Sequence, residues 1–265
     1  ALHGDFVLPP FSPLQARSEG AEVWNRFYQL ANSGLLEKAL IAGEDFFARP
    51  MTMSIRANGE QIRFNPADGK LLESWKGRAV YERKMQSAAL DLTARTTIEY
   101  DGMVRVDLTL LPKQKLTLEH FDYAFHLPRN HAKFLHFIGG PEQNNLSIMI
   151  PRESFTFSVP EKNGVFFEEP FKSLVWLGNH DRGFLWFSES EQHFSPQEPA
   201  ERPAALTASA SDSEVSFQVS PVTAAYEIDQ PITYTFGFFA TPVRPMPEKW
   251  RSWLFTTRRA SYGSE

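Results

Sequence analysis

Apolar and polar residues alternate with a period of two along much of the chain. Around an Asp101-Gly102 pair, one alternating run ends and another begins, with apolar positions at Ile98 and Tyr100 before it and at Val104, Val106, Leu108 and Leu110 after it. Successive side chains of a strand point to opposite faces, and Asp-Gly favours a tight turn. This segment therefore predicts a β-hairpin.

The same pattern continues through residues 116–128, and shorter runs of aromatic and β-branched residues follow at 154–159, 164–169, 213–220 and 232–240. Pro, Gly, Asn or Ser bound these runs, as expected of strands separated by turns. We expect an all-β chain, a large antiparallel β-sandwich of the super-sandwich type with one or two short helices.

Two segments predict those helices. Residues 33–43, SGLLEKALIAG, place Leu35, Leu36, Ala39 and Leu40 on one helical face between Ser33 and Gly43, although barely three turns of helix are also compatible with an extended segment. Ser suits the start of a helix and Gly its end. Residues 246–255, MPEKWRSWLF, have Pro247 and Glu248 near their start and space Trp250 and Leu254 four apart, which is typical of one short helix.

Composition excludes several classes of function. The 265 residues include 27 Lys and Arg against 32 Asp and Glu, so the chain lacks the net positive charge that favours a nucleic-acid partner. No apolar run reaches the roughly 18 residues needed to cross a bilayer, so we expect no membrane partner. There is no cysteine for a disulfide or thiol chemistry. No phosphate-binding or dinucleotide-binding glycine motif occurs, and we expect no cofactor.

One polar turn carries the candidate binding residues. In LVWLGNHDRGFLWFSES, residues 174–190, the cluster His180, Asp181 and Arg182 separates two aromatic runs. Asn, Asp and Gly commonly serve only to build such a turn, but loops also carry binding groups. His180 and Arg182 can donate hydrogen bonds to sugar hydroxyls, and Asp181 can accept them. With Trp186 in the second run, they are our candidates for contact with a sugar or a neighbouring domain.

No catalytic or metal-binding set emerges from the spacing of the remaining groups. The acidic pairs Glu44-Asp45 and Glu168-Glu169 are sequential, so on a strand their side chains point to opposite faces. The histidines lack the spacing of a local metal site. We expect no catalytic residue and no metal in this chain.

Four segments, in order, resemble a known family. They are NRFYQLANSGLLEKALIAGEDFFARPMTM (25–53), EYDGMVRVDLTLLP (99–112), SLVWLGNHDRGFLWFSES (173–190) and FGFFATPVRPMPEKWRSW (236–253). Together they are similar to the N-terminal β-sandwich of glycoside hydrolase family 123-like proteins. Asn179-His180 stands where that pattern usually has an acidic residue, which weakens a charge-specific role for the turn.

The resemblance implies a multi-domain enzyme in which the sandwich, residues 1–243, precedes a catalytic (β/α) barrel. Residues 244–265 would then form the exit helix or linker toward a barrel outside this sequence. The family's barrel hydrolyses N-acetylhexosamine-containing glycans through an Asp-Glu pair, and no residue here matches that pair. The implied partners are a carbohydrate and the barrel, and the implied location is periplasmic or secreted.

Two other functions fit an aromatic sandwich. A free-standing carbohydrate-binding module needs an exposed aromatic platform. A mutarotase-like or polysaccharide-lyase-like sandwich enzyme needs His and carboxylate side chains that converge, with His126, His180 and His193 as the histidines to test.

Overall fold

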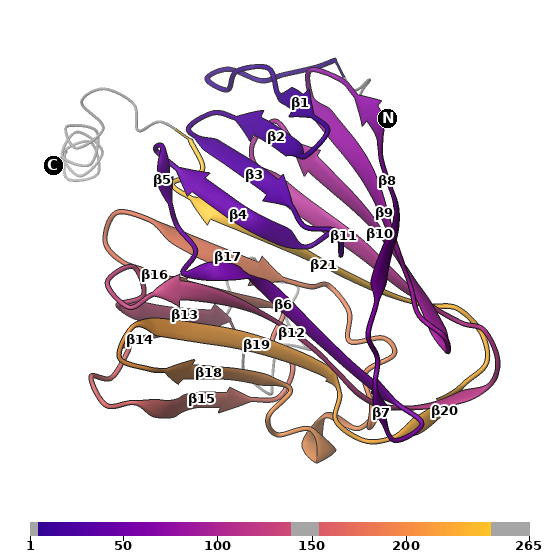
Figure 1. The fold of residues 1–265 in the computed structure, drawn as a ribbon. Coiled ribbons are helices and arrows are strands. Elements are labelled where there is room, and N and C mark those ends of the chain that lie inside the picture. Colours follow the sequence, from indigo (N-terminus) through magenta and orange to yellow (C-terminus); the bar gives the residue numbers. More distant parts are fainter. Residues whose placement is uncertain (1–4, 139–153, 245–265) are drawn as a thin grey trace, which may run out of the picture.

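Three antiparallel sheets build the molecule in the computed structural model, which describes residues 5–138 and 154–244. A nine-stranded sheet runs in the order β14 (Ser154–Ser158), β13 (Phe134–Ile138), β16 (Leu174–Gly178), β17 (Gly183–Phe187), β21 (Ile232–Thr241), β11 (Met103–Pro112), β10 (Leu90–Glu99), β9 (Arg78–Gln86) and β8 (Asn65–Ser74). This all-β architecture is the predicted one (Figure 1).

Two shorter sheets complete the fold. The first runs in the order β1 (Gln15–Arg17), β2 (Gly20–Val23), β3 (Arg26–Leu30), β4 (Leu36–Ile41) and β5 (Glu44–Asp45). The second runs in the order β15 (Gly164–Glu169), β18 (Leu206–Ala210), β19 (Glu214–Val222), β12 (Leu116–Pro128), β6 (Arg49–Ala57) and β7 (Glu60–Gln61), with β20 (Tyr226–Ile228) paired to β12.

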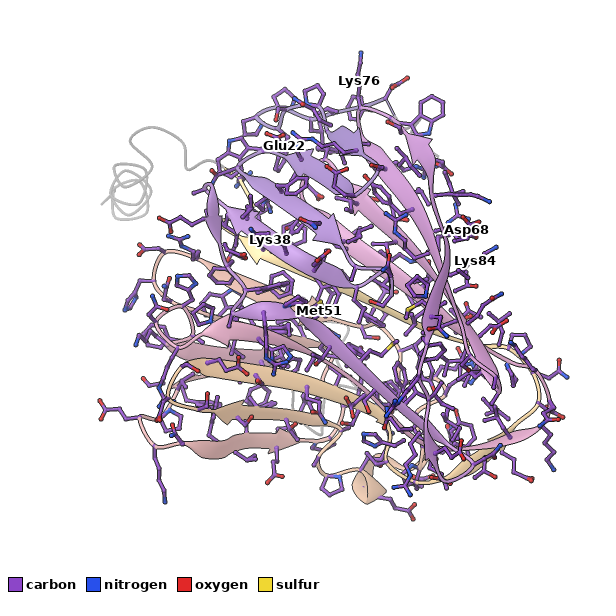
Figure 2. All side chains as sticks on the ribbon, in the orientation of Figure 1. Glu22, Lys38, Met51, Asp68, Lys76 and Lys84 are labelled. Atoms are coloured by element: carbon purple, nitrogen blue, oxygen red, sulfur yellow. The ribbon has the colours of Figure 1, made fainter. Side chains whose placement is uncertain are left out.

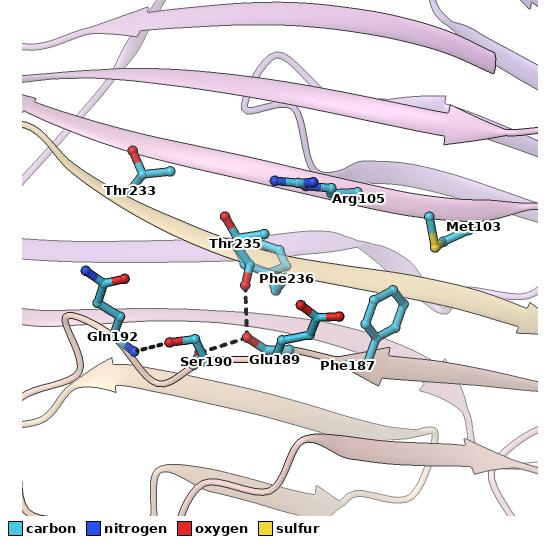
Figure 3. Close-up of a pocket in the computed structure, with 10 residues that line it drawn as sticks. Met103, Arg105, Phe187, Glu189, Ser190, Gln192, Thr233, Thr235 and Phe236 are labelled. Carbon is cyan, nitrogen blue, oxygen red and sulfur yellow. Dashed lines mark hydrogen bonds between the residues drawn. The ribbon is translucent and has the colours of Figure 1, made fainter. Parts of the chain in front are cut away.

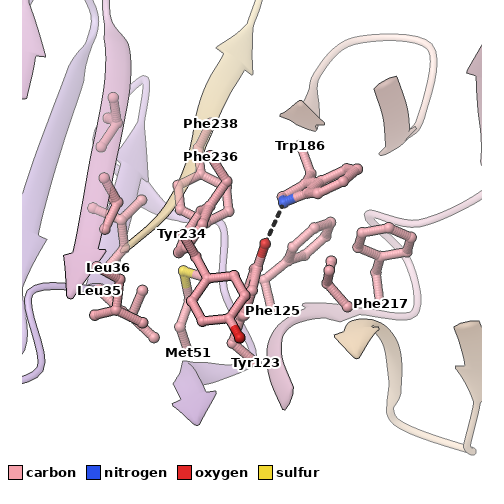
Figure 4. Close-up of a cluster of buried hydrophobic side chains, with 14 of the residues drawn as sticks. Leu35, Leu36, Met51, Tyr123, Phe125, Trp186, Phe217, Tyr234, Phe236 and Phe238 are labelled. Atoms are coloured by element: carbon pink, nitrogen blue, oxygen red, sulfur yellow. Dashed lines mark hydrogen bonds between the residues drawn. The ribbon is translucent and has the colours of Figure 1, made fainter. Parts of the chain in front are cut away.

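Both shorter sheets pack against the nine-stranded sheet, which is the common layer. Toward the five-stranded sheet, the Thr96 hydroxyl of β10 donates to the Gly34 carbonyl at 2.7 Å. Toward the seven-stranded sheet, the Phe236 ring of β21 stacks on the Tyr123 ring of β12, with 4.2 Å between centroids. The buried apolar side chains form one continuous cluster, shown in part in Figure 4. The opposite face of the nine-stranded sheet, here called its outer face, stays uncovered by these two sheets.

The alternation of apolar residues along the long strand β12 is interrupted by a β-bulge. Leu118 and Phe121 both point into the core although they are three residues apart. The register of β12 against β6 shifts between Leu118 and His120, as a β-bulge requires. One extra residue thus restores the buried face of the second half of the strand.

The helix predicted over residues 33–43 is wrong, because Leu36–Ile41 is strand β4. Gly43, which resembles a helix stop, forms with Ala42 the two-residue turn of a hairpin, with φ of 81° and 55°. Positive φ at both positions matches the twist of paired strands. The backbone groups of β4 pair with the neighbouring strands β3 and β5, so the segment belongs to two consecutive hairpins that its apolar spacing does not reveal.

The second predicted helix, 246–255, lies outside the described residues. Within the described ranges, the helical element is a short 3-10 turn at Pro199–Glu201. No helix in these ranges is long and apolar enough to cross a membrane.

Candidate functional site

The polar turn 179–182 is built by its asparagine. The Asn179 side-chain oxygen accepts the backbone N–H groups of Asp181 and Arg182, each at 3.0 Å. The Asn179 N–H in turn donates to the Arg182 carbonyl at 2.8 Å. Asn179 therefore closes the tip of the β16–β17 hairpin, and it leaves the His180 and Asp181 side chains exposed.

Arg182 is engaged within the protein. Its guanidinium lies 2.8 Å from a Glu44 carboxylate oxygen and donates to the Ile41 carbonyl at 3.4 Å. The His180 ring meets the Phe134 ring edge to face at 4.8 Å. Arg182 thus ties the hairpin tip to the β4–β5 turn, and His180 with Asp181 remain as the exposed polar groups of the predicted set.

Trp186 points to the other side of the hairpin. It is 0% exposed, and its indole N–H donates to the Tyr123 hydroxyl at 3.1 Å, as Figure 4 shows. A ring with no exposed surface has no face to offer a sugar. The structure therefore brings His180, Asp181 and Arg182 together at the tip but places Trp186 in the core between two sheets.

Trp176, which the sequence did not single out, lies on the outer face. Its half-buried ring lies over Gly178 and Gly183, which are cross-strand partners. A Cβ atom added to either glycine would collide with the ring. The indole N–H donates to the Thr241 hydroxyl at 3.1 Å. The two glycines that flank the polar turn therefore let the ring lie flat on β16 and β17.

The chain leaves the sandwich beside this hairpin. Thr241, at the end of β21, pairs with Gly183 at the start of β17. Arg26, only 3% exposed, donates to the carbonyls of Ala240 at 2.8 Å and Val243 at 2.6 Å. It also donates to the Asp101 carbonyl at 2.9 Å. Through these bonds to backbone carbonyls, the buried Arg26 guanidinium fixes this outgoing segment to the β10–β11 turn.

The incoming segment reaches the same end of the sheets. The Leu14 N–H donates to the carbonyl of Lys76, which lies in the turn after β8 and is labelled in Figure 2. Next to Lys76 is Trp75, which is 47% exposed. We call this end of the molecule the exit rim, made of the turns 24–25, 42–43, 75–77, 100–102 and 179–182 with residues 242–244.

A cavity of about 340 Å³ opens on the outer face, between β17, β21 and β11 (Figure 3). Phe187 lines it and lies over Gly237, where a Cβ would collide with the ring. Arg105 and Glu189, both exposed, also line it. The remaining lining residues are Met103, Ser188, Ser190, Gln192, Thr233, Thr235 and Phe236.

Hydrogen bonds fix the walls of this cavity. The Ser188 hydroxyl lies 2.9 Å from the carbonyl oxygens of both Ser190 and Thr235. Asp107 accepts from Arg105 at 2.9 Å and from the Thr235 hydroxyl at 2.7 Å. The cavity therefore has one aromatic wall, formed by Phe187, and polar walls that include side chains fixed by hydrogen bonds.

The histidines do not converge. His126 is 3% exposed on the outward side of β12, where its ring nitrogens lie 3.0 Å from the Thr52 hydroxyl and 2.8 Å from the Ser216 hydroxyl. Burial, with the positive charge of Arg49, lowers the pKa of His126 to about 4, so it is neutral at pH 7. His193 instead contacts Tyr234, and His180 contacts Phe134. Each histidine therefore has a separate neighbourhood.

Among the described residues, no group of three or more His, Cys, Asp or Glu side chains is arranged to hold a metal ion. The His120 ring contacts the Asp122 carboxylate, and these two form a pair on β12.

Comparison with known families gives the chain its assignment. The family model of glycoside hydrolase 123, third domain, matches residues 18–242. The chain belongs to the glycoside hydrolase 123 family. This is the family that the four segments resemble, and the matching glycoside hydrolase 123 model is that of a third domain, whereas the resemblance implied an N-terminal one. No curated protein matches the chain.

Solved structures align with this glycoside hydrolase 123 domain at very low identity. A copper-containing benzylamine oxidase from Hansenula polymorpha aligns with a TM-score of 0.50 and 6% identity, over 92% of this chain and 64% of that one. The Slr1438 protein of Synechocystis sp. PCC 6803 aligns with a TM-score of 0.49 and 9% identity, over 88% and 96%. A candidate aldose 1-epimerase of Escherichia coli K12 gives 0.46 and 6%, over 86% and 98%.

Proposed function

We propose that this chain is a non-catalytic β-sandwich domain of a multi-domain glycoside hydrolase that acts on N-acetylhexosamine-containing glycans. In this proposal it packs on the catalytic barrel and helps to shape the entrance to its site. The match to the glycoside hydrolase 123 third domain over residues 18–242 is the observation that carries the proposal. The same membership supports a role in polysaccharide degradation in the periplasm or outside the cell.

The exit rim is the proposed docking surface for the barrel. Leu14 and Thr241 lie near the two ends of the matched region, and both are held at this rim. Polypeptide on either side of residues 18–242 therefore meets the same end of the sandwich. Residues 244–265 are proposed to be the exit helix or linker toward the catalytic barrel. The exposed His180 and Asp181 are proposed to contact the neighbouring domain.

The separation of the histidines supports a non-catalytic role. A mutarotase-like or lyase-like enzyme would bring a histidine and a carboxylate to one open site. The most enclosed of the three, His126, is hydrogen-bonded at both ring nitrogens and almost fully buried. Its environment is that of a structural side chain.

A rim variant in the parent polypeptide, which contains the neighbouring domains, tests the proposal. His180→Ala combined with Asp181→Ala is expected to lower kcat/KM on 4-nitrophenyl N-acetyl-β-hexosaminides severalfold and to lower the Tm of the parent protein. Exposed side chains contribute little inside an isolated domain, so the Tm of residues 1–265 alone is expected to stay unchanged.

A matched control lies at the opposite end of the sheets. Lys115 and Glu227 form an exposed ion pair at 2.8 Å between the start of β12 and β20. Changing both to Ala is expected to leave the parent enzyme unaffected. Equal behaviour of the two double variants would reject the rim as the docking surface, and turnover by residues 1–265 alone would reject the non-catalytic role.

A further inference from the structure

We propose that the outer face of the nine-stranded sheet is a binding site for a short glycan chain, which lies across β16, β17, β21 and β11. The aromatic rings that would contact it are Trp176 and Phe187, and the cavity lined by Arg105 and Glu189 would take one end. The expectation that its sugars are N-acetylated rests on the proposed function. The site itself rests on the geometry of this face.

Glycines of the sheet leave room for both rings to lie against its backbone. Trp176 covers Gly178 and Gly183, and Phe187 covers Gly237 of the adjacent strand β21. Each ring therefore has one face against the backbone, and Trp176 and Phe187 are both only half-buried. A pyranose ring presents flat patches of C–H groups, which pack on the exposed face of such an aromatic ring. A flat, fixed ring also loses little conformational entropy when a sugar binds.

The two rings are separated by a distance that suits several linked sugars. Gly183, beneath Trp176, and Phe187 lie four residues apart on β17, which is about 13 Å at the rise of a β-strand. Between them, Leu185 and Phe239 are cross-strand partners whose half-buried side chains point to the same outer face. Together these residues form a continuous apolar strip, long enough for a chain of about three sugar rings.

Hydrogen-bonding groups border the strip. The Arg105 guanidinium is fixed by Asp107 at 2.9 Å, yet its side chain is 55% exposed. The Glu189 carboxylate is exposed and has no hydrogen bond or ion pair with the part of the chain that the structure describes. One cation and one free carboxylate can donate to and accept from the hydroxyls of a neutral sugar. The cavity of about 340 Å³ falls in the usual range for small-molecule sites.

The strip favours a glycan over a protein helix for a physical reason. A helix buries projecting side chains in a groove, whereas both aromatic rings here lie against the sheet backbone. The cavity is bordered by hydroxyl, amide and charged groups, and polar groups buried under a protein partner would each need a matching partner. A sugar carries closely spaced hydroxyl groups, which can form hydrogen bonds with such polar groups. The face is therefore matched to a ligand that is apolar on its ring faces and polar at its edges.

Titration calorimetry on residues 1–265 tests this site directly. The probes are triacetylchitotriose, cellotriose and the monosaccharide N-acetylglucosamine. We expect the trisaccharides to bind more tightly than the monosaccharide, because they contact both rings. Trp176→Ala is expected to weaken trisaccharide binding about tenfold or more, and Glu189→Ala severalfold. Trp176→Phe, which retains a ring, is expected to fall between the native protein and Trp176→Ala.

Trp75→Ala is the matched control, because Trp75 is a 47% exposed tryptophan at the exit rim that follows β8, the edge strand farthest from β16 and β17 in the nine-stranded sheet. It is expected to bind the trisaccharides as the native protein does. Far-ultraviolet circular dichroism and Tm confirm that each variant is folded. Absence of trisaccharide binding, or equal loss in Trp75→Ala and Trp176→Ala, would overturn the site. These binding results are independent of the rim variants, which are measured in the parent polypeptide. The proposed docking function is therefore tested separately from the glycan site.

Discussion

The two faces of the β16–β17 hairpin carry the same type of side chain for different purposes. On the inner face, Trp186 is 0% exposed and its N–H reaches Tyr123 of the opposite sheet. On the outer face, Trp176 lies half-buried across Gly178 and Gly183. The register pairs Trp176 with Leu185 and Trp186 with Val175, so the two tryptophan side chains point to opposite faces of the sheet.

This contrast shows what determines the role of an aromatic residue in a sandwich. The inner ring is surrounded by Phe171 and Phe217 and fills space between layers. The outer ring meets positions without side chains, so the sheet itself is its support. An aromatic residue facing out over glycines is therefore better evidence for a binding surface than one inside the core.

The largest expected effect comes from emptying the inner face. Trp186→Ala should lower the free energy of unfolding by about 3–5 kcal/mol, because it leaves a cavity and an unpaired Tyr123 hydroxyl. Urea denaturation measures this change. Trp176→Ala, measured in parallel, should lose less than half as much. Equal losses would mean that the outer ring is also a core residue, and the contrast between the faces would disappear.

A smaller effect is expected from a methyl group under the outer ring. Gly183→Ala places a Cβ where the Trp176 ring lies, so the ring must lift from the sheet. We expect a loss of about 1–3 kcal/mol, together with weaker glycan binding. Gly43→Ala is a useful comparison, because no atom lies within 4 Å of the added Cβ although its φ is +81°. If Gly183→Ala bound trisaccharides like the native protein, the flat ring would not be the binding surface.

The smallest expected effect is at the hairpin tip. Arg182→Ala removes the ion pair with Glu44, whose side chains are 22% and 66% exposed, and should cost about 1 kcal/mol or less. High salt should reduce the difference between variant and native protein, since exposed charges are screened. Thermal unfolding at two salt concentrations measures it. A loss as large as that of Trp186→Ala would show that the tip, rather than the packed hairpin body, stabilises this region.

Local patterns predicted the strands well where alternation was regular. The hairpin at Asp101-Gly102 forms as predicted, with Gly102 at φ 91°. The error over 33–43 arose because Leu35, Leu36 and Ala39 are compatible with a helical face as well as with a strand that faces a core. The pairing of β4 with β3 and β5 decided between them.

Only the part of the candidate site that depends on local sequence was predicted. The turn Asn179–Arg182 is recognisable from its residue types, because they form a tight turn through local hydrogen bonds. The outward tryptophan was not recognised. A useful signal was present in the WLG and RGF sequences, where glycines stand two residues after Trp176 and at the opposite position of the hairpin.

The sequence by itself determined the all-β class and the main hairpins, because alternation and turn chemistry act between near neighbours. Only the tertiary structure decided which side of each strand is covered. That choice placed Trp186 inside and Trp176 outside, brought Leu14 and Thr241 to one rim, and opened the cavity beside Phe187. Its physical cause is the packing of two sheets on one side of a third, which depends on contacts between residues far apart in the chain.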